Sequence, residues 1–176
     1  MRLFVSIDLP APVREELHGL LPVHPDLRYT SKEQLHLTLL FLGECNEDER
    51  LLVSGRLQTI QFDPFEITIQ GVGAFPNKKS PRVIWAGVNK SNELMNLQKQ
   101  VSDELSAFAD GRGDHPFKPH ITLARTTRRF KPQKPGQLFK KMEPISVVVE
   151  SISLKKSILS AEGSIHTVLE RVKAEK

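Results

Sequence analysis

The tetrapeptides HLTL at 36–39 and HITL at 120–123 carry the most information about this chain. Each places an imidazole and a hydroxyl two residues apart in an apolar, partly β-branched setting. Because side chains alternate across a β-strand, His36 and Thr38 share one face, as do His120 and Thr122, and the residues between them face a core. Two such strands side by side would bring two imidazoles and two hydroxyls together, which suits proton transfer around a phosphate.

The motif occurs twice, and this repetition favours a catalytic role for it over a purely structural one. For six His and eight Thr in 176 residues, chance gives about a quarter of one His-x-Thr pair. A single copy is most typical of a half-buried strand with a hydrogen-bonded histidine. Two copies with the same apolar pattern indicate a pair of matched catalytic strands.

Segments around the motifs also recur. The segment MRLFVSI at 1–7 resembles PRVIWAG at 81–87, and ITIQG at 67–71 resembles VVVES at 147–151, both at an offset of 80 residues. The motifs themselves lie 84 residues apart. We interpret this as an internal duplication within one domain, 1–176. It predicts lobes at about 1–80 and 81–176, related by a pseudo-two-fold axis around a shared cleft, with some exchange of strands between them.

Composition excludes several classes of protein. With 39% hydrophobic and 26% charged residues, the chain is typical of a soluble globular domain. It has neither an apolar run that could span a bilayer nor the start of a signal peptide, so we expect a cytoplasmic protein without membrane contact. A single cysteine, Cys45, fits a reducing compartment. The net charge of +4 weakly favours a polyanionic partner.

Local patterns predict an α+β fold with antiparallel or mixed sheets. The predicted strands are 2–8, 35–42, 65–72, 82–88, 120–125, 146–154 and 165–172, and the last two would form a hairpin across 160–164. The predicted helices are 10–21, 46–60 and 92–109, with a short one near 135–141; loops are expected at 22–31 and 110–114.

The motifs lack the features of other hydrolytic sites. No carboxylate stands at metal-ligand spacing from either histidine, so we expect no metal and no cofactor. No Gly-x-Ser-x-Gly elbow is present for a serine nucleophile. Phosphoryl transfer by a histidine pair remains, with one imidazole as base and the other as acid. Thr38 and Thr122 would donate hydrogen bonds to the phosphate.

The chain resembles a known superfamily. The paired His-x-Thr motifs, the segment FKPHITLAR at 117–125, the opening RLFVSID at 2–8 and the late LKKS at 154–157 are similar to the two-histidine phosphoesterases. Within that superfamily the chain looks most like the bacterial and archaeal RNA 2′,3′-cyclic phosphodiesterases, also called 2′-5′ RNA ligases. The resemblance implies a bilobal, LigT-like α+β fold with two antiparallel sheets, flanked by helices, around a central cleft.

The same resemblance implies a reaction. His120 would be the proton acceptor that activates water against a terminal 2′,3′-cyclic phosphate. His36 would be the proton donor to the departing 3′ oxygen, which leaves a 2′-phosphate. With an RNA 5′-hydroxyl in place of water, the product is a 2′-5′ linkage. The sequence alone is symmetric and does not say which imidazole does which. The expected partner is RNA with a cyclic end, such as a tRNA half, bound by a monomer.

Other residues are candidates for substrate contacts. Arg125 resembles a further phosphate contact of the family, although strand alternation turns it away from Thr122 unless the strand ends or bulges after Leu123. Four aromatic residues could stack on a nucleobase, although aromatics in strands are more often core. They are Phe4, Tyr29, Phe75 and Trp85.

Two further features concern RNA. The basic residues of 128–134, with Arg128, Arg129, Lys131 and Lys134, could follow an RNA backbone or form a plain solvated loop. His166 stands where relatives often have an aromatic residue, which could alter base preference.

Two alternatives stay open. The enzyme could act on a smaller ligand, such as ADP-ribose 1″,2″-cyclic phosphate or a 2′-5′ oligonucleotide, although the basic segment favours a longer RNA. Alternatively, the chain could be an RNA-binding module with incidental catalysis. Two intact motifs argue against that second alternative.

Overall fold

The computed structural model describes residues 1–111, 115–131 and 135–175. Its strands are β1 (Arg2–Asp8), β2 (Leu27–Tyr29), β3 (His36–Glu44), β4 (Phe65–Phe75), β5 (Val83–Val88), β6 (His120–Thr126), β7 (Ile145–Val149), β8 (Ser151–Ser160) and β9 (Gly163–Lys173). Its helices are α1 (Ala11–His18), α2 (Glu47–Leu57), α3 (Asn92–Leu105) and α4 (Pro135–Leu138), with 3₁₀ turns η1 (Lys32–Gln34) and η2 (Ser106–Phe108).

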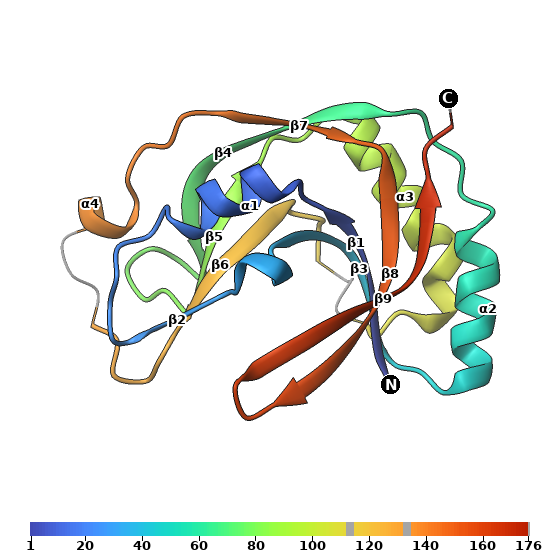
Figure 1. Cartoon of the computed structure of the whole chain (residues 1–176), viewed down its shortest axis with the longest axis horizontal. Helices are drawn as coiled ribbons and strands as arrows, with labels where there is room; N and C mark the ends of the chain where they lie inside the picture. The colour runs from blue at the N-terminus through green and yellow to red at the C-terminus, as the bar shows by residue number, and fades with distance from the viewer. Residues whose placement is uncertain (112–114, 132–134, 176) are drawn as a thin grey trace.

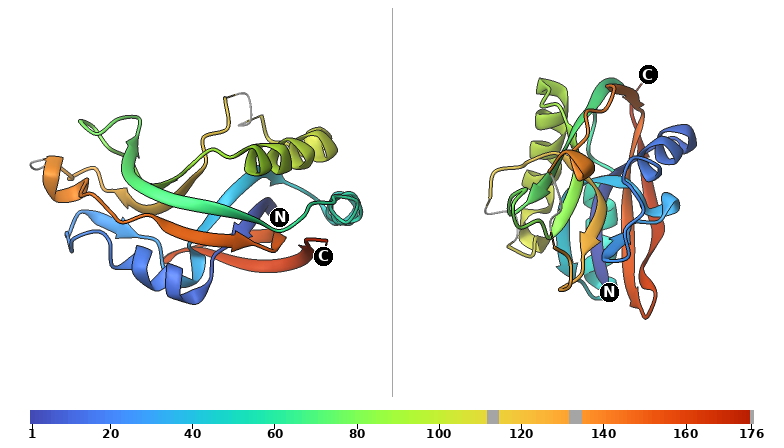
Figure 2. Two further views of the ribbon diagram at one scale, coloured as in Figure 1. Left: turned by 90° about the horizontal axis from the view of Figure 1, so that it is seen from above. Right: turned by 90° about the vertical axis from the view of Figure 1, so that its left-hand side faces the viewer.

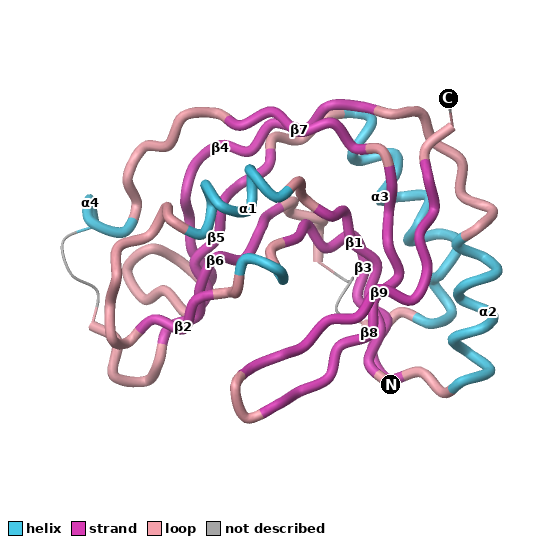
Figure 3. The backbone as a smooth tube through the Cα atoms, in the orientation of Figure 1, coloured by secondary structure: helices cyan, strands magenta, loops and turns pink. Residues whose placement is uncertain are grey.

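The strands form two antiparallel sheets that join at one point. In space the order is β7-β4-β5-β6-β3-β1-β8-β9, and β2 pairs with β6. Between β6 and β3 the ladder contains a single pair, Leu37 with Ile121, so the four strands on each side are separate sheets that meet there. Together they curve into an arch (Figures 1 and 3). The predicted α+β fold with two antiparallel sheets is confirmed.

The two sheets repeat one strand order. From the junction outward, β6-β5-β4-β7 corresponds to β3-β1-β8-β9. Within this order Ser6 lies opposite Thr38, and Trp85 lies opposite Thr122. Ser6 and Trp85 therefore hold equivalent places at an offset of 79 residues, whereas the sequence match had an offset of 80. The match of 67–71 with 147–151 is wrong, because Ile67 and Val147 are direct partners on neighbouring strands. An alternating strand pattern resembles itself at any even shift, so it does not fix the register.

The chain crosses between the sheets near its end. A single strand was expected at 146–154, but it is divided at Glu150 into β7, which pairs with β4, and β8, which pairs with β1. The predicted hairpin of the last strands is confirmed as β8 and β9. A short strand, β2, lies inside the segment 22–31 that was expected to be a loop, and β3 continues past Gly43.

The helices cover the arch on both sides, with α1 and α3 on opposite faces (Figure 2). The predicted capping box of α2 is confirmed, since Asn46 Oδ1 accepts from the Glu49 amide at 2.9 Å and Glu49 Oε2 accepts from the Asn46 amide at 2.8 Å. Helix α1 ends at His18, three residues earlier than expected, with Gly19 as its C-cap. Of the predicted loop, 112–114 lies outside the described residues. In the described part of the chain, no helix has the length and apolar character to span a membrane.

One close approach in the second sheet fixes an aromatic side chain. Gly73 of β4 lies opposite Trp85 of β5, and a Cβ added at Gly73 would lie 2.3 Å from the indole Cη2. The indole therefore lies directly on the glycine backbone, in a space that only glycine leaves open.

We expect Gly73→Ala to displace the Trp85 indole. Overpacking of this kind lowers the free energy of unfolding by about 1–3 kcal/mol. Urea unfolding followed by emission of Trp85, the sole tryptophan, measures both effects. The matched control is Gly55→Ala in α2, where a Cβ meets nothing within 4 Å, so stability should rise by about 0.4–1 kcal/mol. Unchanged emission and stability of Gly73→Ala would contradict the close packing.

Candidate active site

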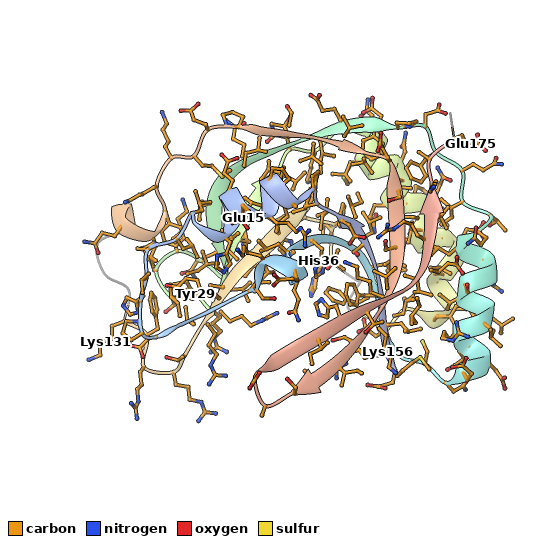
Figure 4. The ribbon with its side chains drawn as sticks, viewed as in Figure 1. Glu15, Tyr29, His36, Lys131, Lys156 and Glu175 are labelled. Atoms are coloured by element: carbon orange, nitrogen blue, oxygen red, sulfur yellow. The ribbon has the colours of Figure 1, made fainter. Side chains whose placement is uncertain are left out.

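The two predicted motifs meet on one face at the junction of the sheets. Leu37 pairs with Ile121, and both are fully buried. Because neighbours on a strand point the opposite way, the residues that flank this pair project from the other face. His36, Thr38, His120 and Thr122 therefore gather around one point, and Figure 4 shows His36 on the inner side of the arch. The structure thus brings all four predicted residues together.

Each imidazole is held in the same way. His36 Nδ1 lies 2.6 Å from the Gln34 carbonyl oxygen, and His120 Nδ1 lies 2.7 Å from that of Lys118. A carbonyl oxygen only accepts, so in both rings Nδ1 carries the proton and donates it. The neutral imidazoles therefore present an unprotonated Nε2, which for His36 lies 2.9 Å from the hydroxyl oxygen of Thr38.

A β-bulge follows each motif. On β3, Leu40 lies opposite Val5 but Thr38 lies opposite Ser6, so Leu39 is an extra residue. On β6, the corresponding extra residue is Leu123. A bulge reverses the alternation that follows it. As a result two successive residues are buried after each threonine, and the next side chain returns to the histidine face.

The side chains that return to this face differ between the copies. After the first motif it is Phe41, which is 43% exposed. After the second it is Arg125, also exposed, whose charge acts on His120. The bulge that Arg125 required in order to share a face with Thr122 is therefore present.

Aromatic rings surround His36. The Phe4 ring centroid lies 5.0 Å from that of His36, and the His166 ring lies edge-on at 5.3 Å. Phe4 also contacts His166 at 4.9 Å and Phe41 at 6.2 Å. The hairpin of β8 and β9 brings His166 here, and Gln34 in η1 donates a hydrogen bond to the Ser164 carbonyl of that hairpin. The first motif thus lies against an apolar, aromatic wall.

Two aromatic rings and two cations lie near His120. Phe75 stands perpendicular to it, with ring centroids 4.9 Å apart, and Trp85 lies at 6.3 Å. The Lys118 ammonium lies over both aromatic rings, 5.3 Å from Phe75 and 5.0 Å from Trp85. Together with Arg125, this lysine makes the second motif's side of the site positively charged.

Burial keeps both histidines neutral. It lowers the pKa of His36 to about 4, and the charges of Lys155 and His166 act in the same direction, against the Gln34 carbonyl and Asp8. Burial also lowers the pKa of His120, helped by Lys118 and Arg125. At neutral pH the site without substrate therefore holds two uncharged imidazoles, each able to accept a proton.

A charge cluster around the buried Lys155 lies beside the first motif, and the sequence did not predict it. Lys155 of β8 is 5% exposed and forms an ion pair with Asp8, which also accepts from the Ser153 hydroxyl at 2.8 Å. Arg171 lies 3.4 Å from the same carboxylate. Polar residues at alternate positions of two otherwise apolar strands were the available signal. The hydroxyl of Ser6, also on this face of β1, is buried and has no hydrogen-bond partner among the described residues.

One aromatic candidate lies apart from the histidines. Tyr29 is on β2, and its hydroxyl accepts from the His24 amide at 2.7 Å and donates to the Pro22 carbonyl. These bonds give it a part in holding that turn. Of the predicted basic segment, Lys131 lies at the end of the molecule near β2 (Figure 4), and Lys134 lies outside the described residues.

We expect Lys155→Met to raise the pKa of His36. The substitution removes a positive charge that opposes the imidazolium and leaves Asp8, which favours it. Histidine ring signals followed by NMR during a pH titration measure the change, and the His120 signal should titrate as in the wild type. Lys156→Met, the next residue of the strand, is the control and should leave His36 unaffected. A variant of Lys155 with the wild-type His36 titration would contradict this electrostatic coupling.

Known proteins are similar to this chain along most of its length. A family model described as the 2′-5′ RNA ligase superfamily matches residues 11–157. An RNA 2′,3′-cyclic phosphodiesterase of Archaeoglobus fulgidus is 37% identical over 172 residues, 94% of this chain and 96% of its own. One of Thermus thermophilus is 38% identical over 189 residues, 97% and 89% of the two chains. The crystal structure of Escherichia coli LigT complexed with 3′-AMP has a TM-score of 0.80 at 26% identity. The match covers 99% of this chain and 98% of that one.

Proposed function

This chain belongs to the 2′-5′ RNA ligase superfamily, and we propose that it opens RNA 2′,3′-cyclic phosphate ends by proton transfer between His36 and His120. The observation that carries the proposal is the matched pair of imidazoles at the sheet junction, in each of which a carbonyl accepts from Nδ1 and leaves Nε2 unprotonated. No metal enters the mechanism, because the two imidazoles can supply the base and the acid.

In the proposed reaction one proton passes to His120 and another leaves His36. His120 Nε2 accepts a proton from water as the water oxygen bonds to phosphorus. The bond from phosphorus to the 3′ oxygen breaks, and His36, which enters protonated, donates its Nε2 proton to that oxygen. The product is an RNA 2′-phosphate with a free 3′-hydroxyl. Solvent then returns each imidazole to its starting state.

The surroundings of the two histidines support this assignment of roles. In an in-line displacement the leaving oxygen and the nucleophile lie on opposite sides of phosphorus. The leaving oxygen belongs to the nucleoside, which suits the aromatic wall of Phe4, Phe41 and His166 beside His36. Water arrives on the opposite side, where His120 lies beside exposed cations.

The remaining polar groups of the site suit the phosphate. Thr38 and Thr122 flank the junction and can each donate a hydroxyl proton to a non-bridging oxygen. Arg125 returns to the same face through its bulge and can add a charged contact. Hydrogen bonds to a charged group contribute about 1.5–3 kcal/mol each. Phe75 and Trp85 lie beside His120 and bound the site on the side of the nucleophile.

We also propose the state, the substrate and the compartment in which the protein works. A monomer acts on cyclic-ended RNA, such as a tRNA half, in the cytoplasm. Cys45 is buried and unpaired, which suits a reducing compartment.

We expect His36→Ala and His120→Ala each to lower kcat by about 10²–10⁴, because each removes one proton-transfer group. The measurement is release of 2′-phosphate from a short RNA with a 2′,3′-cyclic end, in excess EDTA. His18→Ala, an exposed histidine of α1, is the control and should keep wild-type turnover. Wild-type activity that EDTA abolishes would overturn the metal-free mechanism, and active histidine variants would overturn the assigned roles.

The pH profile should differ between kcat/KM and kcat. The reactive form needs His36 protonated and His120 neutral, and in the free enzyme the pKa of His36 is about 4. An anionic phosphate beside the imidazolium raises the pKa of His36 in the complex. We therefore expect bell-shaped profiles in which the alkaline limb of kcat lies at higher pH than that of kcat/KM. Coincident limbs would contradict this role for the substrate charge.

A further inference from the structure

Gln34 contacts the active site through both its main chain and its side chain. Its carbonyl oxygen accepts from His36 Nδ1 at 2.6 Å, and its side-chain amide donates to the Ser164 carbonyl of the β8–β9 hairpin. The backbone is fixed in turn, because the main-chain amide of Gln34 donates to the Ser31 carbonyl at 3.0 Å. One residue therefore joins the catalytic imidazole to a strand that lies 130 positions away in the sequence.

The outer part of the β8–β9 hairpin has few contacts that fix its position. Strand β8 pairs with β1 as far as Ser157, which lies opposite Arg2, and beyond this pair the hairpin projects as a two-stranded arm (Figure 1). Leu159 near its tip is 68% exposed. Among the described residues outside the hairpin, Gln34 is the one that forms a hydrogen bond with 158–166.

His166 is the residue of this arm that reaches the active site. Its ring centroid lies 4.9 Å from that of Phe4 and 5.3 Å from that of His36. Its Nδ1 atom is buried and has no hydrogen-bond partner within the described part of the chain. The position of the ring therefore depends on packing and on the strand that carries it, two residues beyond the carbonyl that Gln34 contacts.

Lys118 has the equivalent place before the second motif. Its carbonyl oxygen accepts from His120 Nδ1 at 2.7 Å, and its ammonium lies over the rings of Phe75 and Trp85. Gln34 and Lys118 both stand two positions before a catalytic histidine, and both extend a side chain to the elements that carry the neighbouring rings. This repetition indicates that the residue at this position links each imidazole to the wall beside it.

We propose that Gln34 is a positioning residue, which holds His166 beside His36 and so fixes the wall against which the nucleobase of the substrate lies. This inference rests on the proposed function. Without the hydrogen bond to Ser164, the arm and its ring have to be ordered when the base binds, and that ordering weakens binding. The bond therefore acts on recognition of the base and leaves the proton transfers to the two motifs.

The test compares two substrates that differ only in the base. They are adenosine 2′,3′-cyclic phosphate and an analogue in which hydrogen replaces the adenine. For each enzyme, the ratio of the two kcat/KM values measures what the base contributes. Both reactions start from the same free enzyme, so a change in the protonation of His36 cancels in this ratio.

Three substitutions are compared with the wild type. Gln34→Met removes the amide donor and keeps a side chain of similar length. The matched control is Gln58→Met, because the Gln58 amide donates to Glu170, which is nearer the other end of β9. His166→Ala removes the ring itself, and it is combined with Gln34→Met in a double variant. Thermal unfolding checks that every protein is folded.

For Gln34→Met we expect the ratio to fall by about fivefold or more, because stacking of a base contributes at least that much to binding. The loss should lie mainly in the KM of the nucleotide. His166→Ala should lower the ratio as well, and adding Gln34→Met should then change it by less than about twofold, since Gln34 acts through that ring. Gln58→Met should match the wild type.

Other results would overturn the inference. An unchanged ratio in Gln34→Met, or an equal loss on both substrates, would limit Gln34 to support of His36. Additive losses in the double variant would show that Gln34 does not act through His166. A wild-type enzyme that treats the two substrates alike would remove the base from this wall. A wild-type enzyme that hydrolyses no cyclic phosphate would instead overturn the proposed function.

Discussion

The single ladder pair between Leu37 and Ile121 is the constraint on which the site depends. Both side chains are fully buried, so the chain cannot slip by one residue at this point without turning apolar groups to the surface and the histidines into the core. The pair therefore fixes where both motifs project. Because no further pair joins β3 to β6 in the ladder, the junction forms the meeting point of two sheets.

The repeated strand order places one histidine and one threonine in each half of the site. The side chains that follow the two motifs differ, and they make the two halves unequal. Matching bulges at Leu39 and Leu123 return one residue of each strand to the active face. That residue is Phe41 in the first copy and Arg125 in the second. Aromatic rings lie beside both histidines, but the exposed cations Lys118 and Arg125 act on His120, whereas the buried Lys155 acts on His36. Since two equal imidazoles cannot define a direction of proton flow, the asymmetry of their surroundings has to define it.

The sequence predicted what depends on local pattern. The motifs, the capping box at Asn46 and most of the strands follow from periodicity and side-chain chemistry, and the α+β class follows from them. The bulges also have a local sign, since each threonine is followed by two apolar residues. The ion pair of Asp8 with Lys155 and the pairing of Arg28 with Arg125 were beyond prediction. Each joins residues about a hundred or more positions apart, which only the tertiary fold brings together.

The protonation of the histidines depends both on the fold and on the charge of the substrate. Burial beside a nearby lysine makes the imidazolium of His36 unfavourable, and the carbonyl behind each ring fixes the tautomer at little cost in entropy. A neutral ligand entering the site would bring no charge that favours the imidazolium. A phosphodiester brings the one charge that reverses it, because an anion at Nε2 stabilises the protonated ring. The same charge that the threonines and Arg125 can bind therefore also prepares the acid, so recognition of phosphate and activation of the catalyst become one event.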